Sequence, residues 1–167
     1  SKTLNNLINL GSISRLRLLF ELVIIVSQVL AAIYFYKLFC DINKWAATTL
    51  GIWGTVNSVV IMVSAISMSS AISIANASSP TFQEKTILIQ LLGEISTNAW
   101  MVGGLFFGLW HIPMGYIVIS SGRMPMWLGR ILIIGGIGYI LQTFIKSIGV
   151  QSSYLYMIFI HYNVGEL

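Results

Sequence analysis

The chain of 167 residues is 56% hydrophobic and only 8% charged, and its mean hydropathy is +0.85. Soluble domains carry about 25% charged residues, so these few charges cannot cover a water-facing surface. The composition therefore predicts an integral membrane protein. The apolar runs are continuous and much longer than the roughly ten alternating residues of a barrel strand, which excludes a β-barrel. We predict one all-α domain over residues 1–167, a polytopic transmembrane helical bundle with short loops.

The net charge of +4 comes from single Lys and Arg residues near the ends of the apolar runs. This pattern is typical of interfacial anchoring and topology control, not of nucleic-acid binding. We expect the lipid bilayer as a partner, together with a membrane protein or a second copy of the chain. The only histidines are His111 and His161, and Cys40 is the single cysteine. We therefore expect neither a metal nor a cofactor.

The first half of the chain predicts two membrane spans. Residues 3–14 are too polar to span and are expected to form a lead-in. The first span is expected over 18–39. The second, over 46–75, is longer than a perpendicular helix needs, so it should tilt, kink or protrude. Ser67, Ala71 and Ala75 place small side chains on one face of it, where another helix can approach closely.

The polar stretch 76–85 separates the halves. Thr81 and Glu84 have the spacing of a capping box, and 86–98 is expected to be a short helix that leads into a third span over 98–120. Gly104 and Gly108 form a GxxxG packing motif in that span.

The second half continues with a tight turn over 120–125. Gly122 gives the turn backbone freedom, and Pro125 begins the next helix without the loss of a hydrogen bond. A fourth span is expected over 127–147. The apolar run over 154–167 is too short to span at 1.5 Å per residue. We therefore expect it to be the start of a last span and the chain to be a fragment of a longer one.

Several stretches resemble a known family. They are FFGLW at 106–110, P-x-G-Y at 113–116, Ser-Gly at 121–122, P-x-W-L-G at 125–129 and IIGGIGYI at 133–140. These are similar to motifs of an uncharacterised bacterial membrane family, domain of unknown function 4386. The resemblance implies a helical bundle with one further helix at the start and a completed last helix. It implies no activity, and His111 stands where members carry an apolar residue.

Four residues are candidates for a binding site, and none is assigned a catalytic role. Glu21 lies inside the first span, where a carboxyl must face the interior, pair or be protonated; it also lies one turn from Arg17, a spacing that brings the two side chains together. Glu94 and Asn98 share one helix face and could bind a cation or a polar head group, or mark a helix entering from water. His111 could relay protons, or bond to a carbonyl released by Pro113.

Arg123, Trp127 and Arg130 are expected to contact lipid head groups at one membrane surface. The loops over 38–44 and 121–127 should share one side of the membrane. Four Lys and Arg residues on that side against five on the other do not fix the orientation. The family resemblance implies that these two loops lie inside the cell. It also implies a multi-pass protein of the bacterial cytoplasmic membrane.

Three functional hypotheses follow, and whether the protein is an enzyme stays open. The first is a helical binding or accessory module that packs with lipid or a partner protein. The second is a small proton-coupled carrier that uses Glu21, Glu94 and His111, which requires these residues to meet in one cavity. The third is a membrane-embedded enzyme acting on a lipid, which requires a polar cluster at one membrane surface.

Overall fold

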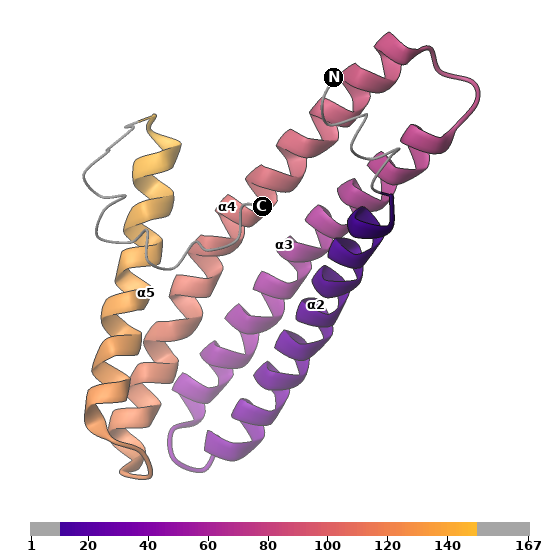
Figure 1. Cartoon of the computed structure of the whole chain (residues 1–167). Helices are drawn as coiled ribbons and strands as arrows, with labels where there is room; N and C mark the ends of the chain where they lie inside the picture. Colours follow the sequence, from indigo (N-terminus) through magenta and orange to yellow (C-terminus); the bar gives the residue numbers. More distant parts are fainter. Residues whose placement is uncertain (1–10, 150–167) are drawn as a thin grey trace.

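The computed structural model describes residues 11–149, and within them the chain forms long helices joined by short turns (Figure 1). The helices are α2 (Gly11–Phe39), α3 (Lys44–Asn76), α4 (Phe82–Ser121) and α5 (Met126–Ser147). All four are long and apolar enough to cross a membrane. The predicted all-α transmembrane architecture is confirmed.

For three of the predicted spans, most of the predicted ends lie close to the ends of a helix. The spans over 46–75 and 127–147 correspond to α3 and α5. The span over 18–39 ends at Phe39 as predicted, but α2 begins at Gly11, so residues 11–14 of the expected lead-in belong to the helix. The last run, over 154–167, lies outside the described residues.

The expected short helix over 86–98 was wrong as a separate element. Residues Phe82–Ser121 form one helix of 40 residues. The polar residues in its first half do not interrupt it, because no proline removes a backbone donor before Pro113. The capping box is confirmed: the Thr81 side chain accepts from the Glu84 backbone, and the Glu84 carboxylate accepts from the Thr81 backbone.

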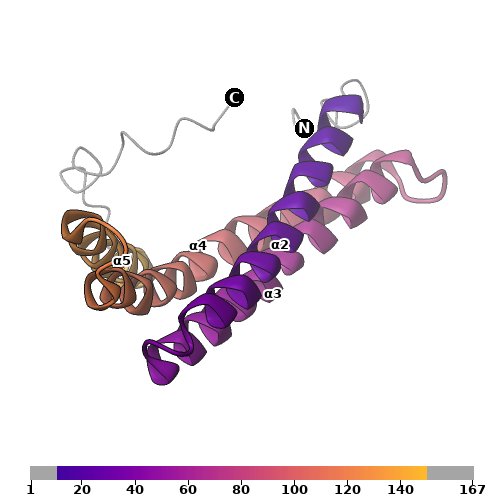
Figure 2. The same ribbon diagram turned by 90° about the horizontal axis from the view of Figure 1, so that it is seen from below.

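Consecutive helices run antiparallel, and each packs against the next along the chain (Figures 1 and 2). The α2–α3 turn and the α4–α5 turn lie at the same end of the molecule, and the α3–α4 loop lies at the other end. This confirms that the two turns share one side. Seen from below, α2 and α3 lie together on one side of α4, and α5 lies on its other side (Figure 2).

The α4–α5 contact is a direct approach of two backbones. A Cβ atom built on Gly108 would lie 2.6 Å from the carbonyl oxygen of Gly136, and one built on Gly115 would lie 2.5 Å from that of Gly129. Gly104 of the predicted motif faces Thr143 at an ordinary 3.4 Å. The predicted packing face is therefore present, but Gly108 and Gly115 make its closest contacts.

The α3–α4 hairpin is fixed at its loop by Lys85. Its ammonium group donates to the carbonyl oxygens of Ala75 and Ala77, which would otherwise lack partners at the end of α3. One turn further along α4, Ile89 packs against Ala71 and Ala75. Two of the three residues of the predicted small-residue face therefore contact α4.

The interior of the bundle is unusually polar for so apolar a chain. Many large apolar side chains lie on the outside of the bundle, and α5 buries only 17% of its most apolar segment. Among the described residues, the buried polar side chains are Glu21, Gln28, Asn57, Ser58, Ser64, Ser67, Ser96 and Thr143. This distribution suits a lipid environment, because hydrocarbon surrounds the apolar outside while polar groups find partners within the bundle.

Candidate functional site

Glu21 is the centre of a polar cluster that joins three helices. Its side chain is buried, with 4% of its surface exposed. The hydroxyl of Ser64, on α3, donates to the carboxylate at 3.1 Å and 3.3 Å from its two oxygens. The Trp100 indole N–H, on α4, donates to Oε1 at 3.4 Å. The carboxylate therefore has partners from both neighbouring helices.

A second hydroxyl extends this cluster. Ser96 Oγ, on α4, lies 2.7 Å from Ser64 Oγ. A hydroxyl has one proton to donate, and that of Ser64 is directed at Glu21, so Ser96 is the donor in this pair. The result is a chain of hydrogen bonds from Ser96 through Ser64 to Glu21, which crosses from α4 through α3 to α2.

The sequence places Glu21 in the interior by its spacing. The buried residues of α2 are Glu21, Ile25, Gln28, Ala32 and Phe39. Their separations of three, four and seven residues bring them to one face of a helix. Glu21 is the first buried residue of α2, so its side chain enters the bundle with the apolar residues that follow.

Arg17 lies beside Glu21 on α2, as predicted. Its Nε atom is 3.7 Å from Glu21 Oε1, while its own side chain is 62% exposed. The Arg17 charge therefore stays at the outside of the bundle and faces the buried carboxylate from one turn away. The pair connects the interior cluster with the surface.

Glu94 and Asn98 are not part of this cluster. Both side chains are exposed on α4, whereas Ser96, between them in the sequence, is buried. Positions two residues apart on a helix point about 200° apart, so burial of Ser96 turns Glu94 and Asn98 away from the interface. Neither Glu94 nor Asn98 therefore reaches Glu21.

His111 lies on a different face of α4. A Cβ atom built on Gly136 of α5 would lie 3.0 Å from the His111 Cβ, so the histidine faces α5. Its ring packs edge-on against Phe107, with centroids 4.2 Å apart, and stacks on Tyr139 at 6.2 Å. It is about 16 Å further along the helix than Trp100, so it does not share the Glu21 cluster.

The hydrogen bond of His111 differs from the predicted one. Its Nδ1 atom lies 2.7 Å from the carbonyl oxygen of Phe107. The carbonyl that Pro113 leaves without a helical donor is that of Leu109, four residues before the proline. The histidine is thus bonded within its own helix, but to a different carbonyl. A neutral ring that donates through Nδ1 leaves Nε2 as an acceptor.

The residues predicted at the membrane surface lie at the α4–α5 turn. Arg123, Trp127 and Arg130 are exposed there, and Gly122 adopts the left-handed backbone that the turn requires, with φ of 61°. Their contact with lipid head groups stays a prediction.

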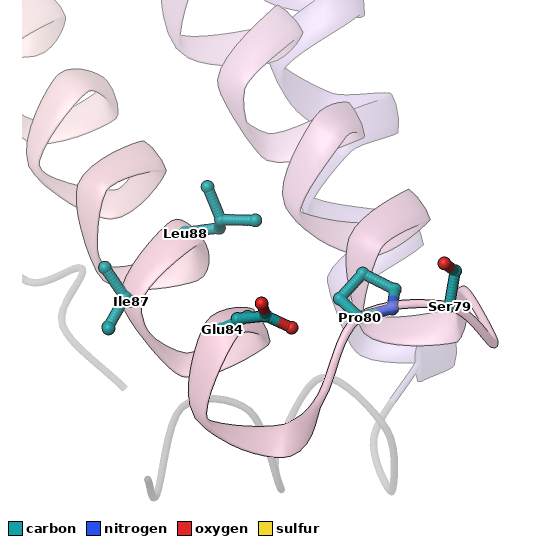
Figure 3. Close-up of a pocket in the computed structure, with 5 residues that line it drawn as sticks. All are labelled: Ser79, Pro80, Glu84, Ile87 and Leu88. Carbon is teal, nitrogen blue, oxygen red and sulfur yellow. The ribbon is translucent and has the colours of Figure 1, made fainter.

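The α3–α4 loop borders an open hollow (Figure 3). Its walls are formed by Ser79, Pro80, Glu84, Ile87 and Leu88. Glu84 points along the loop, and its carboxylate is bonded to the Thr81 backbone and hydroxyl, both at 2.8 Å. The charge of this hollow is thus engaged in the helix cap, and the hollow offers little to recognise a ligand.

Sequence reasoning identified Glu21 and Arg17 but missed the partners on α3 and α4. Ser64, Ser96 and Trp100 were not singled out, although Ser64 lies inside an apolar run. A search for polar residues within the predicted spans would have found it, together with Gln28 and Asn57. Ser64 has none of its surface exposed, so no substrate reaches it as a nucleophile. The cluster is suited to holding helices together, or to binding a proton, rather than to acyl transfer.

Comparison with known proteins agrees with this description. The family model described as "Domain of unknown function (DUF4386)" matches residues 1–167. The chain belongs to this family. An uncharacterised protein from Archaeoglobus fulgidus is 38% identical over 48 residues, which are 29% of this chain and 30% of that protein. The match thus spans under a third of that relative. No solved structure matches the chain.

Proposed function

We propose that this DUF4386 protein is a non-catalytic helical module of the bacterial cytoplasmic membrane, which packs with lipid and with a partner membrane protein. The observation that carries the proposal is the Glu21 cluster. The buried Glu21 carboxylate is bonded to Ser64 and Trp100 and lies beside Arg17, so it holds α2 to α3 and α4. The other candidates, Glu94, Asn98 and His111, lie elsewhere.

The exposed apolar residues of α2 and α5 support the binding role. Val26 on α2 and Ile134 on α5 are 58% and 69% exposed, and each lies on a helix that packs along one side only. Such faces are available to lipid or to a further helix. We place the α2–α3 and α4–α5 turns in the cytoplasm, in keeping with the family resemblance.

Site-specific photo-crosslinking in native membranes tests the proposal. A photoreactive residue at Ile134 or Val26 is expected to give a protein adduct of one defined mass. The same residue at Ile61, which is buried, should give none. Adducts with lipid alone from every exposed position would contradict a partner-binding role.

A second candidate function is a proton-coupled carrier that depends on Glu21 alone. It is favoured by one observation, the hydrogen-bond chain from Ser96 through Ser64 to a buried carboxyl. Proton flux into liposomes that contain the purified chain separates the two functions. We expect no flux that depends on Glu21. Flux that Glu21→Gln abolishes and the exposed control Glu94→Gln preserves would replace the module by the carrier.

A further inference from the structure

Three buried polar atoms in the bundle have no hydrogen-bond partner among the described residues. They are Gln28 Nε2 on α2, Asn57 Oδ1 on α3 and Trp110 Nε1 on α4. Their side chains are 9%, 2% and 9% exposed. Buried polar atoms in folded proteins nearly always have a partner, and the requirement is strict within a membrane. Three such atoms from three adjacent helices call for a shared explanation.

Packing contacts place these atoms in one region of the α2–α3–α4 interface. On one side, Ile25 of α2 packs with Ile61 of α3. On the other side, a Cβ atom built on Gly54 of α3 would lie 3.0 Å from the Ala32 Cβ of α2. Gln28 lies between Ile25 and Ala32, and Asn57 lies between Gly54 and Ile61. The two amide side chains therefore face the same section of the bundle.

Trp110 joins this region from α4. A Cβ atom built on Gly54 would lie 3.1 Å from Trp110 Nε1, so the indole N–H ends beside that glycine. Gly54 precedes Asn57 by one helical turn, about 5 Å. On α4, a Cβ atom built on Gly103 would lie 3.2 Å from Asn57 Oδ1. Two glycines thus border the polar atoms, where larger side chains would press on them.

The chemistry of the three atoms defines what could bind them. Gln28 Nε2 and Trp110 Nε1 are donors, and Asn57 Oδ1 is an acceptor. None of the three groups is charged, so an ion would have no counter-charge from them. An apolar ligand would leave all three unsatisfied. A small neutral molecule that both accepts and donates hydrogen bonds fits all of them, and water has these properties.

We propose that Gln28, Asn57 and Trp110 form an internal hydration site, where ordered water bridges α2, α3 and α4 within the membrane-spanning part of the bundle. The site is separate from the Glu21 cluster, because the packed pair of Ile25 on α2 and Ile61 on α3 lies between the two. It therefore does not depend on the proposed function. Water held there links α2 to the other two helices without a direct bond among these three side chains.

Nuclear magnetic resonance of the full chain in lipid nanodiscs tests the site. The indole N–H signal of Trp110 is assigned by its loss in Trp110→Phe. In the wild-type protein this signal is expected to show a dipolar cross-peak to water. Such a cross-peak would come from bound water, because the surrounding helices keep bulk solvent away from the indole. The absence of this cross-peak from the folded wild-type protein would overturn the proposal.

Two substitutions sharpen the test. Asn57→Leu removes the acceptor and is expected to abolish the water cross-peak. Gly103→Ala brings a methyl group against Asn57 Oδ1 and is expected to weaken it. Asn98→Leu, at an exposed asparagine on α4, is the matched control and should preserve it. Unshifted indole signals of the other tryptophans report that a variant is folded. A direct contact between the Gln28 and Asn57 amides, with the Trp110 peak unaffected by both substitutions, would also refute the site.

Discussion

The carboxylate of Glu21 illustrates what a single charged residue requires between helices. Several kcal/mol are lost when an ion enters a low-dielectric interior, unless hydrogen bonds and an opposite charge compensate. Glu21 obtains hydrogen bonds from Ser64 and Trp100, and an opposite charge from Arg17. Its partners come from all three helices of the interface. A shift in register between α2 and α3 would separate Glu21 from Ser64, so we expect the residue to contribute to the specificity of helix pairing.

Substitution of Glu21 tests this role. Glu21→Ala leaves the Ser64 hydroxyl without its acceptor, so we expect the free energy of unfolding to fall by about 1–3 kcal/mol. Glu21→Gln keeps an acceptor oxygen and should cost less. Glu94→Ala, at an exposed position, should change it by no more than about 0.5 kcal/mol. Unfolding in mixed detergent micelles, followed by tryptophan fluorescence, measures all three. Equal losses of unfolding free energy for Glu94→Ala and Glu21→Ala would show that Glu21 does not hold the helices together.

At this scale the sequence predicts local pairs and misses distant ones. Arg17 and Glu21 are four residues apart, so helical geometry alone brings them together. Ser64 lies 43 residues from Glu21 and 32 from Ser96. Whether those residues meet depends on how two helices are rotated about their axes, and apolar sequences of this kind leave that rotation undetermined. Glu94 and Ser96 show how much this rotation matters. They are two residues apart, yet Glu94 is exposed and Ser96 is buried.

Among the elements, α4 and α5 form the most closely packed pair. Gly115 and Gly129 each face the other's carbonyl oxygen, and Gly108 and Gly136 repeat the arrangement two turns away. Contact of this kind replaces side-chain packing by van der Waals contact between backbones, which is how membrane helices associate closely. The pair is thus held along much of the length of α5.

Alanine substitutions distinguish the packed glycines from the others. Gly115→Ala puts a methyl group 2.5 Å from a backbone oxygen, which forces the helices apart, so we expect a loss of about 1–3 kcal/mol in unfolding free energy. Gly135→Ala is the matched control, because nothing lies within 4 Å of its added Cβ. Thermal unfolding in detergent reports both. A neutral Gly115→Ala would mean that the backbones are further apart than described.

Lys85 offers a test of the α3–α4 loop. Lys85→Met keeps the aliphatic chain but removes the bonds to the carbonyl oxygens of Ala75 and Ala77. We expect faster amide hydrogen exchange over the last turn of α3 and the loop, with exchange in α5 unchanged, because local opening reflects the bonds lost nearby. Uniformly faster exchange across the chain would instead indicate that the substitution destabilises the whole bundle.

Helix ends were predicted well where a residue terminates the helix. Thr81 caps α4 and Gly122 ends it, as their local sequence signatures predicted. Asn43 caps α3 in the same way but was not singled out in the sequence. The beginning of α2 and the continuity of α4 were not predicted. In both cases polar residues occur inside a helix, and hydropathy alone treats a polar stretch as a boundary. Polar side chains do not interrupt helical hydrogen bonds, because every residue except proline supplies a backbone donor.

For the whole molecule, unequal helix lengths are the main feature. At 1.5 Å per residue, α5 is about 33 Å long and matches a hydrocarbon thickness of about 30 Å, whereas α4 is about 60 Å long. Thr143 of α5 donates to the carbonyl oxygen of Met101 on α4, so α5 lies beside the second half of α4. The first half of α4 and the last turns of α3 extend beyond it.

Cysteine accessibility tests this arrangement in a Cys40→Ser background. Ser69→Cys lies on the extended part of α3 and is expected to react with a membrane-impermeant maleimide in nanodiscs. Ile52→Cys, exposed on the same helix but level with α5, should be shielded by lipid. Ser79→Cys, in the loop, is the positive control. Protection of Ser69→Cys as complete as that of Ile52→Cys would place the whole of α3 within lipid.

The order of the helices was predictable at this scale, but their lateral arrangement was not. Short turns require consecutive helices to run antiparallel, which fixes which loops share a side. The position of α5 against α4 alone, away from α2, depends on the glycine faces meeting. The sequence offers other small-residue faces, such as Ser67, Ala71 and Ala75, and does not show that Gly136 of GGIG is the one that meets α4.

The uninterrupted length of α4 has a mechanical consequence. A rigid helix of about 60 Å that reaches from the α3–α4 loop to the α4–α5 turn converts a small rotation into opposite displacements of its ends. A tilt of about 10° about its midpoint would move each end by about 5 Å. Pro113 supplies a point of reduced stiffness near one end. Because α5 is joined to α4 backbone to backbone, we expect the two helices to tilt together.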